Sequence, residues 1–520
     1  MPVGQISRSA RVLQDPQLAG VDAGRRTGVL PHKHARLILT AMKILMVASE
    51  AAPFAKTGGL ADVVGSLPAA LKALGHEVAV LLPRYATVDL KNARRVYDSL
   101  PIWLPPQRYD TSLYLVERET PFYFLDYPPL YDRPGFYGED GLDYPDNHIR
   151  FAVLAQAALA FCRRVWRPDI LHCHDWQAGL APAYLHTIYA NDPTFLGMRS
   201  LFTIHNVGYH GLLPAVALAD IGLAGTEEFR PGGLEFFGKV CYLKGGLNYA
   251  DALNTVSPTY AREIQTPEYG FGLDGVLRAR RQVLSGILNG VDYTEWNPET
   301  DPLIAAHYSS GDLSGKRICK QDLVNAFGLP AEAMDAPLIG IVSRFTSQKG
   351  ADLVADAADG LVAEGYYMVA LGTGEPQYEE LFPAIAARHP SRIAVRIGYD
   401  NALAHKIEAG ADLFLMPSRY EPCGLNQIYS LKYGTVPVVR ATGGLDDTIE
   451  PGTGFKFRNY SGSALVDALR AAREAFADAE AWRAIMLAGM AKDFSWSVSA
   501  AEYARLYERL VAQVKPVDLD

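Results

Sequence analysis

The sequence is poor in cysteine, and its few cysteines show no pairing pattern. Its 520 residues contain five cysteines, an odd number, widely spaced and without a C-x-x-C pair. This pattern predicts neither a disulfide framework nor a zinc ribbon, and it favours a reducing compartment. We therefore expect a cytoplasmic protein.

Long hydrophobic runs and an excess of positive charge are also missing. The longest strongly apolar stretch, near residues 151–162, is shorter than the ~18 residues that cross a bilayer. Aspartate and glutamate (58) outnumber lysine and arginine (49), for a net charge of -9. Because this field repels nucleic acid and anionic membranes, we expect neither as a partner, and an anionic ligand needs local positive groups.

Several common catalytic signatures are absent. The chain has no complete G-x-G-x-x-G, no Walker P-loop, no G-x-S-x-G elbow and no H-E-x-x-H helix. Its one D-x-D is Asp518-Leu519-Asp520 at the chain end, which does not support a metal-bridged diphosphate. We expect neither a metal nor a cofactor.

The first 41 residues show no clear hydrophobic period. Six of them are basic and two acidic, namely Arg8, Arg11, Arg25, Arg26, Lys33 and Arg36 against Asp15 and Asp22. We expect a disordered, dispensable extension over residues 1–41, because Met42 opens a strong strand pattern. A targeting peptide is the alternative, since transit peptides are also rich in arginine and poor in acids.

From Met42 onward, short apolar runs alternate with longer amphipathic stretches. Nearly uniform apolar runs separated by helical patterns predict a parallel, doubly wound α/β sheet. The runs of the first half are 43–49, 78–82, 122–125, 170–172, 201–204, 252–256 and 285–288, and those of the second half are 337–343, 367–371, 393–397, 413–416, 436–439 and 454–457. The restart predicts two Rossmann-like domains.

Turn signals at Asn289-Gly290 and Asn297-Pro298 suggest where the first domain ends. We expect an N-terminal domain over residues 42–286 and a C-terminal domain over 287–498. A last helix over 499–520 is expected to pack back on the first domain. In open parallel sheets ligands bind beyond the carboxyl ends of the strands, so residues just after the apolar runs are the candidates.

The first half has three polar clusters at such positions. In Lys56-Thr57-Gly58-Gly59, the glycines allow close approach of a ligand, the helix start offers free N–H groups to an anion, and Lys56 adds charge. A glycine turn with an exposed lysine explains this segment equally simply.

The other two clusters contain histidine. Asp175 is a candidate acceptor for ligand hydroxyls, and His205-Asn206 follows the next strand. His172-x-His174 also suggests a metal site, but we expect these two side chains to point to different sides, and no further ligands are evident.

In the second half, Arg344 ends a strand and Lys349 precedes a helix. Together they can neutralise a diphosphate leaving group without a metal. After the strand ending at Met416, Pro422 and Gly424 shape a tight loop that presents Glu421 and the amides near Cys423 to Leu425 to a cleft. Thr442-Gly443 follows the next strand in the same manner. Pairing with Arg419, or capping of the next helix, is the alternative role of Glu421.

These motifs together resemble bacterial glycogen synthase and plant starch synthase. The resemblance is carried, in order, by K-T-G-G-L-A-D-V, H-D-W-Q-A-G-L-A-P, T-I-H-N, S-R-F-T-S-Q-K-G and S-R-Y-E-P-C-G-L, and it runs from about Met42 to Glu508. It implies a two-domain GT-B fold with a deep cleft. The implied activity is transfer of glucose from ADP-glucose to the 4-OH at the non-reducing end of an α-1,4-glucan such as glycogen, with retention and without a metal.

The resemblance also implies roles for individual residues. Catalytic roles fall to His205, Arg344, Lys349 and Glu421; substrate-binding roles fall to Lys56, Thr57, Gly58, Gly59, Tyr131, Asp175, Asn206, Cys423, Gly424, Leu425, Thr442 and Gly443. Tyr429 stands where many retaining relatives carry a second acid, which the glycogen synthase branch also lacks. Asn426 replaces the usual threonine.

Other readings remain open at this point. Another GT-B enzyme, including one that uses UDP-glucose, is the first alternative. A catalytically inactive glucan-binding protein built on the same fold is the second.

Overall fold

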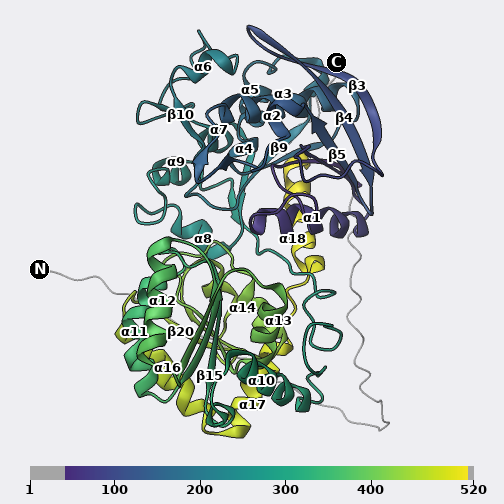
Figure 1. Ribbon diagram of the computed structural model, residues 1–520. Coiled ribbons are helices and arrows are strands. Elements are labelled where there is room, and N and C mark those ends of the chain that lie inside the picture. The colour runs from purple at the N-terminus through teal and green to yellow at the C-terminus, as the bar shows by residue number, and fades with distance from the viewer. Residues whose placement is uncertain (1–40, 513–520) are drawn as a thin grey trace, which may run out of the picture. The chain divides into compact units, whose positions relative to one another are not determined.

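The computed structural model describes residues 41–512, and the extension predicted over 1–41 lies outside this range but for its last residue. The first half of the chain forms a nine-stranded sheet (Figure 1). Its strands are, in spatial order, β14 (Leu284–Gly286), β13 (Ala252–Thr255), β9 (Arg199–Ile204), β8 (Ile170–His174), β1 (Lys43–Val47), β2 (Glu77–Pro83), β5 (Pro121–Asp126), β4 (Gln107–Glu117) and β3 (Arg94–Leu104).

The second half forms a six-stranded, fully parallel sheet. Its order is β17 (Ile393–Ile397), β16 (Tyr367–Gly372), β15 (Leu338–Val342), β18 (Leu413–Met416), β19 (Val436–Arg440) and β20 (Phe455–Phe457). The strand order reverses between β1 and β8 in the first sheet and between β15 and β18 in the second. These are the two positions where an open parallel sheet binds ligands.

Every predicted apolar run is a strand, but the prediction omitted the antiparallel pair β3 and β4. These strands lie at one edge of the first sheet. Their buried residues alternate with exposed ones, as in Tyr109, Thr111 and Leu113 against Arg108 and Asp110. An edge strand with one face in water has no continuous apolar run, so the signal used for the central strands misses it.

Helices cover both faces of each sheet. Alternate residues of β1 enter two cores: Leu45 and Val47 pack with α3 (Asn147–Arg164) and α5 (Leu180–His186), and Ile44 and Met46 pack with α1 (Gly59–Ala73) and α18 (Trp496–Ala512). In the second half, α11 (Ala351–Ala363), α12 (Pro376–Arg388) and α16 (Gly462–Phe476) lie on one face, with α10 (Ser314–Phe327) and α13 (Asn401–Gly410) on the other (Figure 1).

The chain passes between the two sheets at two adjacent segments. The first follows β14, and the second precedes α18, which begins at Trp496 and packs on α1 of the first half. Val291 bridges in parallel to Ser495, and its N–H donates to the carbonyl of Phe494 at 2.9 Å. Because Gly290 lies against the backbone of Trp496, the two segments are in direct contact.

We predict that Gly290→Ala lowers the melting temperature by several degrees. A Cβ there would lie 2.6 Å from Cα of Trp496, and overpacking of this kind costs about 1–3 kcal/mol. The matched control is Gly275→Ala, where the nearest atom is 4.0 Å away on the flexible Arg278 side chain. Thermal unfolding of the three proteins checks this, and equal melting of Gly290→Ala and wild type would contradict the tight contact.

Candidate active site

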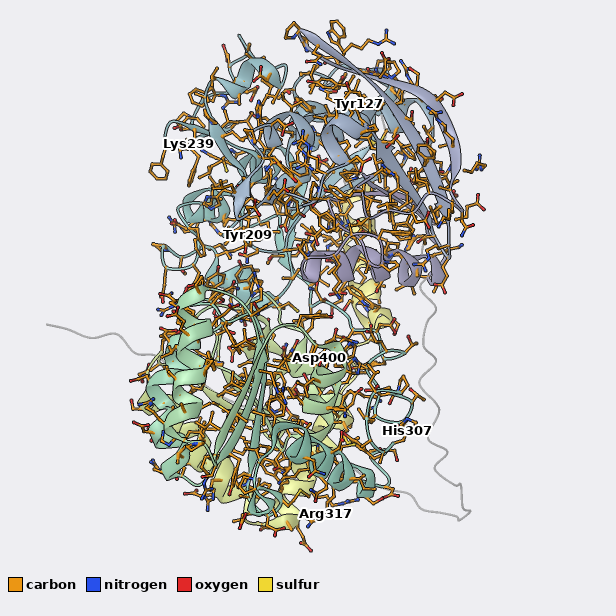
Figure 2. The ribbon with its side chains drawn as sticks, in the orientation of Figure 1. Tyr127, Tyr209, Lys239, His307, Arg317 and Asp400 are labelled. Carbon is orange, nitrogen blue, oxygen red and sulfur yellow. The ribbon has the colours of Figure 1, made fainter. Side chains whose placement is uncertain are left out.

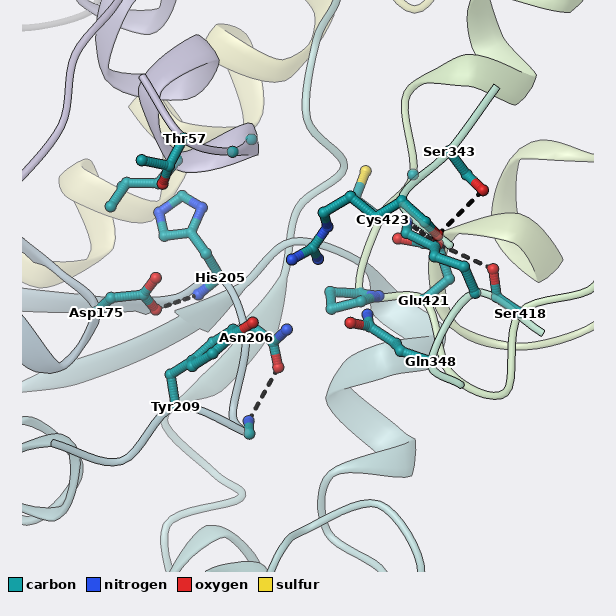
Figure 3. Close-up of a pocket in the computed structure, with 18 of the residues that line it drawn as sticks. Thr57, Asp175, His205, Asn206, Tyr209, Ser343, Gln348, Ser418, Glu421 and Cys423 are labelled. Carbon is teal, nitrogen blue, oxygen red and sulfur yellow. Dashed lines mark hydrogen bonds and ion pairs between the residues drawn. The ribbon is translucent and has the colours of Figure 1, made fainter. Parts of the chain in front are cut away.

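A cavity of about 1130 Å³ is lined by residues from both halves of the chain. Its walls come from the loops after β1, β8 and β9 of the first sheet and after β15 and β18 of the second. Figure 3 shows Asp175, His205 and Asn206 on one side and Ser343, Glu421 and Cys423 on the other. The predicted site residues that line it are Lys56, Thr57, Gly58, Gly59, Asp175, His205, Asn206, Arg344, Lys349, Glu421, Cys423, Gly424 and Leu425.

The glycines of the first loop leave open space beside the start of α1. Gly58 has an extended backbone, with φ of -163°, which any residue can adopt. A Cβ added at Gly58 or Gly59 would have no atom within 4 Å. The fold itself therefore does not require glycine at either position, and the open space belongs to the cavity. Lys56, at the same loop, pairs with Asp62 at 2.6 Å.

Glu50 holds this loop in place, and the sequence analysis did not identify it. Its carboxylate accepts from the Thr57 N–H at 2.5 Å and from the Thr57 hydroxyl at 2.6 Å. It also accepts from the Tyr137 hydroxyl. Glu50 lies three residues after the end of β1 and directly follows the apolar run predicted over residues 43–49. The expectation that ligands bind beyond the carboxyl ends of parallel strands therefore covers it. Nothing in the local sequence marks Tyr137, which only the tertiary fold brings here.

Three histidines form a buried cluster behind one wall. Nδ1 of His174 lies 3.0 Å from Nε2 of His205, and His172 contacts the hydroxyls of Tyr507 and Thr203 at 2.8 and 2.7 Å. The ring centroids of His172 and His174 are 4.0 Å apart. The expectation that they point to different sides is wrong, because residues two apart on a strand share a face.

Burial keeps these imidazoles neutral. It lowers the pKa of His205 to about 3, and it lowers the pKa values of His172 and His174 well below the usual range. His205 is the member of the cluster that lines the cavity. It can therefore offer a ligand one neutral hydrogen-bonding nitrogen, but no positive charge.

Asp175 is held at the start of α4 (Asp175–Ala178) in a left-handed conformation, with φ of 54°. Its Oδ1 accepts from the backbone N–H of His205 at 2.7 Å (Figure 3). Burial raises its pKa to about 7, although hydrogen bonds from the backbone of His205 and Asn206 oppose that rise. A strained, buried carboxyl that titrates near neutrality is typical of a functional site.

The opposite wall carries an ion pair. Nζ of Lys349 lies 2.5 Å from Oε2 of Glu421, which also accepts from the Ser418 hydroxyl at 3.0 Å (Figure 3). Both donors use Oε2, so Oε1 is the oxygen available to a ligand. Tyr429, at the position of the second acid in other retaining enzymes, stacks on Trp296 with ring centroids 4.3 Å apart.

Two arginines follow neighbouring strands of the second sheet but differ in environment. Arg344 is exposed at the cavity wall, and within residues 41–512 no carboxylate lies within ion-pair distance of it. Arg419 instead pairs with Asp352 at 2.8 Å, outside the cavity lining. The alternative in which Glu421 pairs with Arg419 is therefore wrong.

Cys423 and its neighbours line the cavity just before α14 (Asn426–Lys432). Burial raises the pKa of the Cys423 thiol to about 12, so it stays protonated near neutral pH and is a poor nucleophile. Asn426, which replaces the usual threonine, donates to the carbonyl of Val342 at 3.0 Å.

Three predicted substrate-binding residues lie away from the cavity lining. Tyr131 is fully buried in the first core, and its hydroxyl donates to the carbonyl of Arg150 at 2.7 Å. The Thr442 hydroxyl and the Gly443 N–H both donate to Glu263 of the first half, at 2.9 and 3.0 Å. The start of α15 (Gly443–Thr448) does hold an anion, but that anion is a carboxylate of the chain itself.

Between residues 41 and 512, no three histidine, cysteine or acidic side chains are grouped as metal ligands. No helix in this part of the chain has the length and apolar character needed to cross a membrane.

Comparison with known proteins places both halves in glycosyltransferase families. The starch synthase catalytic domain family matches residues 43–279, and glycosyl transferases group 1 matches residues 329–483. Glycogen synthase of Koribacter versatilis is 52% identical over 90% of this chain and 98% of that protein. Glycogen synthase of Anaeromyxobacter dehalogenans (strain 2CP-C) is 51% identical over 90% of this chain and all of that protein.

The chain belongs to the glycogen synthase family. The catalytic domain of starch synthase IV from Arabidopsis thaliana, solved with ADP and acarbose, is 33% identical with a TM-score of 0.82, over 91% of this chain and all of that one. A sucrose-phosphate synthase from Thermosynechococcus elongatus, 18% identical with a TM-score of 0.56, shares the fold. The predicted GT-B fold and glycosyltransferase activity are thereby confirmed for this member of the family.

We predict that Asp175 makes stability fall as pH rises from about 4 to 7. Its pKa is about 7 in the folded protein against an ordinary 3.8. Over this range the unfolded chain is ionised at this position and the folded chain is not, so unfolding is favoured progressively. Asp175→Asn removes this effect and keeps an acceptor for the His205 N–H.

The difference in melting temperature between Asp175→Asn and wild type should therefore increase from pH 5 to pH 8, in favour of the variant. Asp98→Asn is the control for removal of a carboxyl at the surface, because the Asp98 side chain is 90% exposed. A constant difference for Asp175→Asn would show that the carboxyl ionises normally.

Proposed function

We propose that this glycogen synthase family member transfers glucose from ADP-glucose to the non-reducing-end 4-OH of an α-1,4-glucan such as glycogen, with retention of configuration. The observation that carries the proposal is one cavity that joins Arg344 and Lys349 with Glu421, His205 and Asp175. It occurs in a chain 33% identical to a starch synthase that was solved with ADP and acarbose. A cytoplasmic location remains a prediction of the cysteine pattern.

In this proposal the second half of the chain binds the donor. Arg344 has no carboxylate partner among residues 41–512 and offers a planar fork to phosphate oxygens. Lys349 is close enough to Glu421 to bridge it to the diphosphate. The two cations would stabilise the negative charge that develops on the leaving group. Stabilisation of this kind by preorganised groups is usually the largest single contribution to rate enhancement.

The environment of Glu421 favours a role in holding the sugar over one as a nucleophile. An ammonium and a hydroxyl already bind its Oε2, which lowers the electron density available for attack at C1. Its free Oε1 can accept hydrogen bonds from glucose hydroxyls. Tyr429 supplies no second acid, so the paired-carboxylate mechanism of retaining glycosidases lacks its partner.

We therefore favour a front-face reaction. The bond between C1 and the diphosphate oxygen breaks, positive charge develops at C1, and the acceptor 4-OH enters on the same side. Its proton passes to an oxygen of the leaving diphosphate, so no protein base is needed. The neutral His205 imidazole and the Asp175 carboxyl would then orient the sugar. The protein would contribute mainly alignment and charge stabilisation.

A donor competition assay tests the proposal. ADP-glucose and UDP-glucose are supplied separately and together with glycogen, and polymer-bound glucose is measured. We expect transfer from ADP-glucose to predominate. Preferential transfer from UDP-glucose would assign a different donor, and glycogen binding without any transfer would identify an inactive glucan-binding protein.

We predict that Arg344→Ala lowers kcat by roughly 10²–10³, the loss typical of one preorganised charge-stabilising donor. Arg419→Ala is the matched control, because Arg419 follows the neighbouring strand but pairs with Asp352 outside the cavity lining. It should keep kcat within about twofold. Steady-state kinetics with ADP-glucose and glycogen decide, and equal kcat values for the two variants would remove Arg344 from leaving-group stabilisation.

We predict that Glu421→Gln retains more activity than Glu421→Ala. Glutamine keeps the shape and one oxygen acceptor for sugar hydroxyls, and alanine keeps neither. A carboxylate nucleophile would make both variants equally inactive and would leave a sugar ester on the wild-type enzyme. Comparing kcat of the two variants with mass spectrometry of quenched wild type distinguishes the mechanisms, and a glucose adduct at Glu421 would overturn the front-face reaction.

A further inference from the structure

A group of aromatic side chains lies beside the cavity but takes no part in the site described above. It consists of Phe236, Phe237 and Phe271 from the first half and Tyr420 from the second, which we call the aromatic rim. Phe237 is 81% exposed and Phe271 is 40% exposed. Exposed apolar groups of this kind are typical of ligand-binding grooves and interaction sites.

The rim is continuous with the cavity wall. The Phe236 ring packs on that of His210, with centroids 5.2 Å apart, and on that of Phe237 at 4.7 Å. The Phe271 ring packs on Tyr420 at 5.3 Å. His210 and its neighbour Tyr209 line the cavity. Tyr209 and Lys239, which lies two residues after Phe237, are on the same flank of the first half (Figure 2).

Phe237 is held in a turn that does not suit phenylalanine. It and Gly238 connect β11 (Glu235–Phe236) to β12 (Lys239–Cys241), and their φ angles are 48° and 78°. A two-residue hairpin turn with two left-handed residues favours Asn, Asp or Gly at its first position. A bulky residue there is strained, and strain of this kind is found where function requires it.

A second Phe-Gly pair repeats this arrangement. Phe271 and Gly272 also have positive φ angles, 50° and 82°. The two turns pack together, since a Cβ added to Gly272 would lie 3.1 Å from the Phe236 ring and 3.5 Å from the Phe237 ring. Two strained turns therefore support each other and present their rings beside the cavity.

We propose that the aromatic rim binds the outer glucose units of the acceptor glucan. This inference rests on the proposed function. A polymeric acceptor whose end enters the cavity must extend out of it, and the rim adjoins His210, which lines the cavity. Each glucose ring has an apolar face of C–H groups that packs on an aromatic ring, while its hydroxyls stay in water. The rim would thus favour long acceptors over short ones.

Phe237→Asn is the decisive variant. Asparagine suits the left-handed turn, so the hairpin keeps its backbone and loses only the ring. Phe237→Tyr restores a ring. Tyr399→Asn is the matched control, because Tyr399 is 86% exposed and lies outside the cavity lining and the rim. Equal melting temperatures establish that all three variants fold.

The first measurement is the KM for maltoheptaose divided by the KM for maltose, with ADP-glucose saturating. We expect this ratio to rise about three- to tenfold in Phe237→Asn, the size of one aromatic stacking contact. It should stay near the wild-type value in Phe237→Tyr and Tyr399→Asn. An unchanged ratio in Phe237→Asn, or an equal rise in both KM values, would overturn the proposal while wild-type turnover upholds the proposed function.

The second measurement, electrophoresis through a gel that contains glycogen, needs no donor and no turnover. Phe237→Asn should be retarded less than wild type and Tyr399→Asn equally. If wild type transfers no glucose from ADP-glucose but this difference persists, the rim stands and the proposed activity fails. If wild type is not retarded and transfers no glucose, both fail.

Discussion

Parallel strands end at one edge of their sheet, and that constraint determines where every group of the candidate site lies. In each half the strand order reverses beside the first strand of the sheet, at β1 and β8 and again at β15 and β18. The loops that leave these strands cannot cover one another, so they leave backbone amides and polar side chains facing a common space. The cavity is the consequence of this arrangement in the two halves.

The two walls contribute different electrostatics. The first half buries His172, His174 and His205 together, and burial keeps all three neutral. The second half places Arg344 and the ion pair of Lys349 with Glu421 at the cavity. A donor with an anionic diphosphate and a neutral sugar would therefore meet Arg344 and Lys349 on one side. On the other it would meet the neutral His205 imidazole, with Lys56 and Glu50 at the first loop. That division matches a reaction in which charge separates between the diphosphate and C1.

Contacts between the two halves pair a carboxylate of one half with a helix start of the other, an arrangement that also binds anionic ligands. Asp447 of α15 accepts from Thr259 at 2.6 Å and from Ser257, both at the start of α8 (Pro258–Glu263). Glu263, at the end of α8, accepts in return from Thr442 and Gly443. A carboxylate from one half thus occupies the helix start of the other. The polar loop at Thr442 therefore connects the two halves.

Sequence periodicity alone determined the central strands of both sheets, because each is buried on both faces and therefore reads as a continuous apolar run. Ligands bind beyond the carboxyl ends of parallel strands, and this expectation likewise identified candidate residues that follow such runs, from Lys56 to Glu421. Tertiary structure alone decided the surroundings of residues that do not follow a strand in the sequence. It brings Tyr137 to the first loop, buries Tyr131 in the core and places the Glu263 carboxylate at the Gly443 N–H. It also decided which cation pairs with Glu421, since an ion pair depends on the approach of two loops, and spacing along the chain carries no information about that approach.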